Sequence, residues 1–303
     1  MCDENTIADD EALLAAQGKT KLSRRQFTAV SGGAAVATML PVTGLAEELV
    51  EEIAAAALTE SEVTITTPDG EADAFFVHPA EGKHAAVLVW PDVIGLRDAY
   101  RLVGRRLAAS GYSVLVVNPY YRSAKAPVVP AGASFRDEAT RAVVLPMARS
   151  LTPATNVTDA NAFVGWLDAQ EAVDTSRKVG TTGYCMGGAM TMRTAAALPG
   201  RVGAGASFHG GRLVTDDLDS PHRLVPVMNA QFLIAVAEND DKRDPVAKSV
   251  LAQAFEAAEL TAEIEVYEGA QHGWCTPDSA VHNEAQANRA WGRLLATFET
   301  ALA

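Results

Sequence analysis

The sequence predicts an α/β protein whose mostly parallel sheet is covered by helices on both faces. Residues 85–90 and 113–118 are almost continuously apolar, as is typical of strands buried on both sides. Residues 159–168 carry apolar side chains at i, i+3, i+4 and i+7, which predicts a helix packed on such a sheet. Strands that alternate with helices are joined by crossovers, and crossovers produce parallel pairing.

Length and composition fit one large domain or two small ones. The chain has 303 residues, of which 48 % are hydrophobic, enough for a sizeable core. The formal net charge of −13 excludes the basic surface that nucleic-acid binding requires. The three cysteines, Cys2, Cys185 and Cys275, are too few for a disulfide scaffold, so each needs its own explanation.

Residues 1–46 are typical of a twin-arginine export signal. A polar start is followed by SRRQF at residues 23–27, which matches the consensus, whereas Thr28 and Ala29 depart from it. A Gly- and Ala-rich apolar run then ends in small residues at Gly44 and Ala46, as at a cleavage site. We therefore expect the twin-arginine export machinery as a partner, removal of the signal near Ala46, and a periplasmic or secreted protein.

The apolar run has two other interpretations, a membrane anchor or an ordinary buried helix. At about 18 residues it is at the short limit for a bilayer span. It is also interrupted by Thr, Ser, Gly and Pro, which makes it a poor anchor. We expect no stable membrane span.

A single domain is predicted over residues 61–303, after a helical or linker segment at 47–60. Residues 61–66 and 73–77 flank the turn sequence TPDG, which predicts an N-terminal β-hairpin. Residues 120–155 are irregular, with one possible helix at 135–148, and such an excursion often forms part of a substrate pocket. The remaining predicted strands are 179–182, 202–208, 232–237 and 263–267, and the remaining predicted helices are 97–110, 189–198, 245–260 and a C-terminal helix containing Trp291, Leu294, Leu295 and Phe298.

Cys185 has the sequence context of a nucleophile. It is the centre of G-x-C-x-G at residues 183–187, between a predicted strand and a predicted helix. In such a turn the glycines avoid collision, the helix dipole favours a thiolate, and the Met186 N–H is available for an oxyanion. The alternatives are an inert buried cysteine and a redox carrier, and the second lacks a C-x-x-C motif.

The acid and the base are expected later in the chain, in that order. Asp240 follows the strand at 232–237 and is the preferred acid, with Asp241 as its rival; a solvated loop carboxylate or a helix cap is the alternative. His272 follows the last strand between small residues and is the predicted base. His209, at the end of another strand, is predicted either to line the pocket or to be structural. No spacing of histidine, cysteine and carboxylate resembles a metal site.

With these residues identified, the sequence resembles the dienelactone hydrolase family from about Val63 to the C-terminus. The resemblance depends on several motifs in register: WPDVIGL at 90–96, NPYYR at 118–122, GYCMGG at 183–188, AEND at 237–240 and AQHGW at 270–274. It implies an α/β-hydrolase fold and hydrolysis of an ester or lactone through a thioester on Cys185, with no cofactor.

The resemblance also implies roles for other residues. Asp92, where glutamate is usual, would contact the resting cysteine, and the Val93 N–H would be the second oxyanion donor. Arg122 would hold a substrate carboxylate, and Tyr121 and Trp274 would belong to the substrate-binding or cysteine-orienting set. The family usually has a second carboxylate-binding arginine a few residues past the histidine, and its absence from residues 273–276 argues against a dienelactone itself.

Three functional alternatives stay open at this point. A thioesterase or a general carboxylesterase would use the same residues on the same fold. A non-catalytic small-molecule-binding protein could keep the fold, although all three triad residue types are present.

In an oxidising compartment, Cys275 is also a candidate to pair with Cys185.

Overall fold

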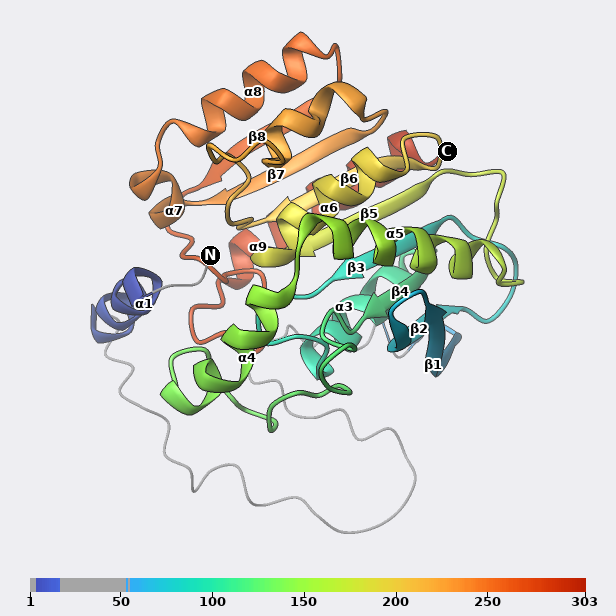
Figure 1. Cartoon of the computed structure of the whole chain (residues 1–303), viewed down its shortest axis with the longest axis horizontal. Helices are drawn as coiled ribbons and strands as arrows, with labels where there is room; N and C mark the ends of the chain where they lie inside the picture. The colour runs from blue at the N-terminus through green and yellow to red at the C-terminus, as the bar shows by residue number, and fades with distance from the viewer. Residues whose placement is uncertain (1–3, 17–52, 54) are drawn as a thin grey trace.

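The computed structural model describes residues 4–16, 53 and 55–303 (Figure 1). The strands are β1 (Leu58–Thr67), β2 (Gly70–Pro79), β3 (Ala86–Trp90), β4 (Ser113–Val117), β5 (Val179–Tyr184), β6 (Val202–Phe208), β7 (Gln231–Ala237) and β8 (Ala262–Tyr267). The helices are α1 (Glu4–Ala16), α3 (Asp98–Ala109), α4 (Glu138–Ser150), α5 (Pro153–Asp168), α6 (Met186–Ala197), α7 (Glu238–Arg243), α8 (Ala247–Ala257) and α9 (Glu284–Ala301), with a 3₁₀ helix at Pro221–Val227.

The strands form one sheet in the order β1-β2-β4-β3-β5-β6-β7-β8. β1 and β2 make the predicted hairpin, β2 pairs antiparallel with β4, and all other pairs are parallel. The predicted α/β-hydrolase architecture is therefore confirmed. Because the parallel strands run in one direction, their carboxyl ends meet at one edge of the sheet, where such folds place their sites.

Both faces of the sheet are covered, as the continuous apolar strands require. Val87 and Val89 of β3 point to the side where α3 and α9 pack, and they join the same core cluster. Ala86 and Leu88 point to the other side and pack with α5 and α6. Figure 1 shows α5, α6 and α8 on the near face and α3 and α9 behind the sheet. Successive side chains of one strand thus fill two cores.

Two local predictions were incomplete. α5 begins at Pro153 rather than at Asp159, because Thr152 and Thr155 form a reciprocal capping box that starts the helix earlier. The segment that begins at Glu238 is the helix α7 rather than a loop.

The predicted export signal falls largely outside the described residues. Its paired arginines and apolar run are not described, so the signal stays a prediction. α1 precedes them and lies near α7, at the carboxyl edge of the sheet (Figure 1). There Asp9 accepts hydrogen bonds from Asn239 at 3.1 Å and Arg243 at 2.8 Å. Within the described part of the chain, no helix combines the length and apolarity needed to cross a bilayer.

Candidate active site

Cys185 occupies a strained turn between β5 and α6. Its backbone φ is 54° and ψ is −115°, a conformation that is costly for a residue with a side chain. Glycine is needed on both sides: a Cβ on Gly183 would lie 2.0 Å from the Gly187 carbonyl oxygen, and one on Gly187 would lie 2.3 Å from the Trp90 oxygen. The turn therefore holds Cys185, 2 % exposed, at the start of a helix.

Gly187→Ala is expected to destabilise the protein strongly. Because the new Cβ would strike the backbone of Trp90 and Pro91, the loss in free energy of unfolding should reach about 1–3 kcal/mol or more. Gly165→Ala is the matched control, since no neighbouring atom lies within 4 Å of the position that its new methyl group would take. Urea denaturation of both variants checks this, and equal stability of the two would contradict the close packing described.

The loop after β3 packs directly against this turn. A Cβ on Gly187 would lie 2.3 Å from the Trp90 oxygen and 2.8 Å from the Pro91 oxygen, so this loop runs close to the start of α6. Tyr120 connects the two: its hydroxyl donates to the Val93 carbonyl oxygen at 2.8 Å and lies 3.4 Å from the Met186 sulfur. The Met186 N–H belongs to the first turn of α6, where helix N–H groups have no intrahelical acceptor. Among the backbone hydrogen bonds of the described residues, none is donated by the Val93 N–H. Both N–H groups are thus available for an oxyanion.

His272 and Asp240 form a short hydrogen bond beside this turn. The His272 Nδ1 and an Asp240 carboxylate oxygen are 2.6 Å apart, and His272 is 5 % exposed. The His272 backbone N–H donates to the Asn239 side chain at 2.9 Å, which fixes the loop. Asp241 instead binds the Lys248 ammonium at 2.5 Å. Of the two candidate acids, Asp240 is the one in contact with the histidine.

The charges of this cluster shift its pKa values in opposite directions. Burial lowers the pKa of His272, but the charges of Asp240 and Cys185 and the hydrogen bond to Asp240 raise it by more, to about 10. Burial raises the pKa of Asp240, but the charge and hydrogen bond of His272 lower it more. The pKa of this carboxyl group is therefore below its ordinary value. The arrangement favours a protonated His272 beside an ionised Asp240.

This pair is expected to stabilise the fold most at mildly acidic pH. The pKa of His272 is raised from 6.5 to about 10, so its contribution is complete below pH 6.5 and is lost as pH rises through the higher value. The lowered pKa of Asp240 means that its contribution is lost only as pH falls below its ordinary 3.8. Asp240→Asn should therefore cost more unfolding free energy at about pH 6 than at about pH 10. Urea denaturation at both pH values measures this, and an equal cost would contradict a protonated His272.

His209 packs against His272 and is not exposed. Its ring centroid lies 4.8 Å from that of His272 in an edge-on arrangement, and the residue is 1 % exposed with φ at 40°. Burial and the charge of His272 lower its pKa to about 3, so it is neutral at working pH. Trp274 is fully buried. Its ring centroid lies 5.3 Å from that of His209, and its ring stacks on Tyr267. His209 thus packs between His272 and Trp274, and Trp274 belongs to the core rather than to an open pocket wall.

Asp92 has a partner that the sequence did not suggest. Its two carboxylate oxygens accept from the Arg97 guanidinium at 2.8 and 2.9 Å, and one of them also accepts from the Ile94 N–H. The predicted contact of Asp92 with the resting cysteine therefore has a competitor that occupies both oxygens. From the sequence, Arg97 was predicted only to begin the helix at 97–110, with no role in the site.

Arg122 and Tyr121 belong to a separate polar cluster. The Arg122 guanidinium binds the buried Asp159 carboxylate at 2.6 and 2.9 Å and Asp69 at 2.6 and 3.0 Å. The Tyr121 hydroxyl donates to Asp159 and bonds the Thr67 hydroxyl, each at 2.8 Å. These contacts tie the loop after β4 to α5 and to the hairpin turn. The geometry thus gives Arg122 a structural role, with its charge neutralised by two carboxylates. The core-facing Asp159 was the sequence signal for this cluster, since a buried carboxylate needs a cationic partner.

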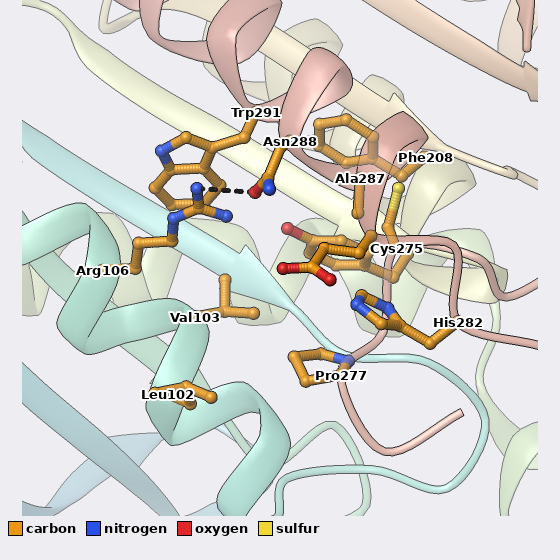
Figure 2. Close-up of a pocket in the computed structure, with 12 residues that line it drawn as sticks. Leu102, Val103, Arg106, Phe208, Cys275, Pro277, His282, Ala287, Asn288 and Trp291 are labelled. Carbon is orange, nitrogen blue, oxygen red and sulfur yellow. Dashed lines mark hydrogen bonds between the residues drawn. The ribbon is translucent and has the colours of Figure 1, made fainter. Parts of the chain in front are cut away.

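Cys275 faces a small cavity of about 50 Å³ between α3 and α9 (Figure 2). Tyr184 and Phe208 line it, together with residues of both helices, and none of Cys185, Asp240 and His272 does. Burial raises the pKa of the Cys275 thiol well above its ordinary value, which keeps it protonated and weakly nucleophilic. The structure contains no disulfide between Cys275 and Cys185. Over the described residues, no group of His, Cys, Asp and Glu side chains is arranged to hold a metal ion.

Comparisons with known proteins concern the whole chain rather than single site residues. The sequence profile described as "Dienelactone hydrolase family" matches residues 72–302. A Methylorubrum extorquens protein described as "Putative carboxymethylenebutenolidase" is 28 % identical over 95 % of this chain and 96 % of its own length.

Solved structures share the fold. A dienelactone hydrolase-like promiscuous phosphotriesterase from metagenomic libraries superposes with a TM-score of 0.67 at 21 % identity, covering 82 % of this chain and 100 % of its own. A dienelactone hydrolase from Anabaena variabilis does so with a TM-score of 0.58 at 17 % identity, over 82 % of this chain and 100 % of its own.

Proposed function

Because the chain belongs to the dienelactone hydrolase family and is a hydrolase of that type, we propose that it cleaves an ester or lactone through a thioester on Cys185. In this proposal His272 is the proton carrier and Asp240 holds its tautomer. The observation that supports it most is the buried His272, whose Nδ1 lies 2.6 Å from Asp240 and whose pKa is raised in part by the neighbouring Cys185.

In the first half-reaction the Cys185 thiolate attacks the substrate carbonyl carbon. A C–S bond forms, and the carbonyl electron pair moves to the oxygen, where the N–H groups of Met186 and Val93 stabilise it. Each such donor contributes about 3 kcal/mol in related acyl transfers. When the carbonyl re-forms, the C–O bond to the leaving group breaks, and the His272 imidazolium gives its proton to the leaving oxygen.

In the second half-reaction water replaces the leaving group. Neutral His272 accepts a proton from a water molecule whose oxygen attacks the thioester carbonyl. The C–S bond then breaks, the thiolate returns to Cys185, and the carboxylic acid product departs. Asp240 keeps the His272 Nδ1 protonated throughout, so the other ring nitrogen faces the reaction.

We further infer that the substrate does not depend on a free carboxylate. Arg122 is neutralised by Asp69 and Asp159, and residues 273–276, directly after His272, contain no arginine. A simple ester or neutral lactone therefore fits this chain better than a dienelactone. A thioester or a general carboxylic ester would use the same residues, so the leaving group has to be found by substrate profiling.

A substrate panel with selective alkylation tests this proposal. The full chain carrying Cys2→Ser and Cys275→Ser leaves Cys185 as the one cysteine for iodoacetamide. Turnover of p-nitrophenyl esters, neutral enol lactones, a carboxylate-bearing dienelactone and an acyl thioester is measured before and after alkylation. We expect ester or neutral-lactone hydrolysis that alkylation removes. Hydrolysis that survives full alkylation, or turnover of none of the panel by reduced protein, would reject the proposal.

A further inference from the structure

Arg97 joins two loops of the catalytic centre through paired hydrogen bonds. Its Nη1 and Nη2 donate to the two Asp92 oxygens at 2.8 and 2.9 Å, while Nε and Nη2 donate to Asp278 at 2.7 and 2.9 Å. Nη1 also donates to the Gly95 carbonyl oxygen at 3.2 Å. The Arg97 side chain is only 14 % exposed. Two-point contacts to both carboxylates fix direction as well as distance, which one ammonium group cannot reproduce.

The two carboxylates belong to segments with different tasks in the proposed reaction. Asp92 directly precedes Val93, and it also accepts from the Ile94 N–H at 2.9 Å, so the backbone on both sides of the proposed oxyanion donor is held. Asp278 lies in the turn that follows His272, where Trp274 and Thr276 close successive backbone turns. Arg97 thus sets the position of the oxyanion loop relative to the histidine loop.

Arg97 also compensates the charge of Asp92. This carboxylate is 12 % exposed in its side chain and follows the strand that packs against the Cys185 turn. Without a cation it would be a buried negative charge near the thiolate, and like charges disfavour ionisation of each other.

We propose that Arg97 is a positioning residue of this active site. It aligns the Val93 N–H with the His272 loop, and it compensates the negative charge of Asp92 near Cys185. The proposal deepens the proposed function and rests on it. A merely structural clamp would lower thermal stability and leave the turnover of folded enzyme unchanged.

The test uses three variants of the full chain and one control. Arg97→Lys keeps the charge but loses the paired geometry, Arg97→Met removes both, and Asp278→Asn weakens only one end. Arg101→Lys is the control, because Arg101 lies in the first turns of α3, just after the N-cap residue Arg97, and pairs with Glu62 of the hairpin instead. For each protein, kcat and KM with the best ester, the rate of Cys185 alkylation at neutral pH, and Tm are measured.

We expect Arg97→Lys to lower kcat about 10- to 100-fold with little change in KM, as a displacement of about 1 Å does in a catalytic site. Alkylation should slow more in Arg97→Met than in Arg97→Lys, and Arg101→Lys should match the wild type. If the Arg97 variants do not fold, Asp278→Asn serves as the test. A loss of kcat in this variant, smaller than that expected for Arg97→Lys and with KM unchanged, would support the proposal.

Changes in Tm alone, with kcat and alkylation rates equal to those of Arg101→Lys, would overturn the proposal. Failure of the proposed function is a separate result, seen as a wild-type enzyme that hydrolyses no ester. The alkylation rates would still report whether Arg97 acts on the thiol.

Discussion

Cys185→Ala is expected to lower kcat for an activated ester by about 10⁴-fold or more, because it removes the atom that forms the acyl-enzyme. The backbone should change little, since alanine can replace cysteine in the same turn. Activity is measured with p-nitrophenyl acetate on protein purified under reducing conditions. Far-ultraviolet circular dichroism confirms that the variant is folded.

Cys275→Ser is the matched control for this variant. Cys275 lines the cavity between α3 and α9, and burial raises the pKa of its thiol, so it is not expected to react. The control should keep kcat within about threefold of the wild type, as most changes outside a site do. If Cys275→Ser lost activity while Cys185→Ala kept it, or if Cys185→Ala were still active in any case, the nucleophile would lie elsewhere.

Asp240→Asn is expected to lower kcat by about 10⁴-fold, the loss seen when the acid of a Ser-His-Asp triad becomes an amide. The amide would stabilise the wrong tautomer of His272, so the ring nitrogen beside Cys185 would carry a proton when it should accept one. Steady-state kinetics with the same ester measures this loss.

Asp241→Asn provides the neighbouring control. Its carboxylate binds Lys248 rather than the histidine, so its loss should change kcat by no more than about threefold. A larger loss in Asp241→Asn than in Asp240→Asn would mean that the loop rearranges and that the contact at 2.6 Å is not the functional one.

Most of the fold is predictable because burial leaves a strong pattern. The runs at 85–90 and 113–118 are apolar throughout, and both became strands with a core on each side. Short-range capping was harder to predict: α5 starts early through the pair Thr152 and Thr155, and the six residues of α7 are too few to show a helical period.

The candidate site was predictable where local sequence determines geometry. Gly183 and Gly187 are required because a Cβ on them would lie 2.0 and 2.3 Å from backbone oxygens. Long-range ion pairs were not predictable, since no local pattern relates Arg97 to Asp278, 181 residues away. Arg122 was assigned by resemblance to a substrate carboxylate, and Asp159 neutralises it instead.

The central claim, a thioester on Cys185, is tested most directly by trapping the acyl-enzyme. The full chain is mixed with excess p-nitrophenyl ester, quenched in acid after a few milliseconds, digested, and analysed by mass spectrometry. The account predicts one added acyl group on the peptide that contains Cys185, and none on the peptide that contains Cys275. An acyl group on another residue, or turnover without an acyl group on Cys185 at any quench time, would contradict it.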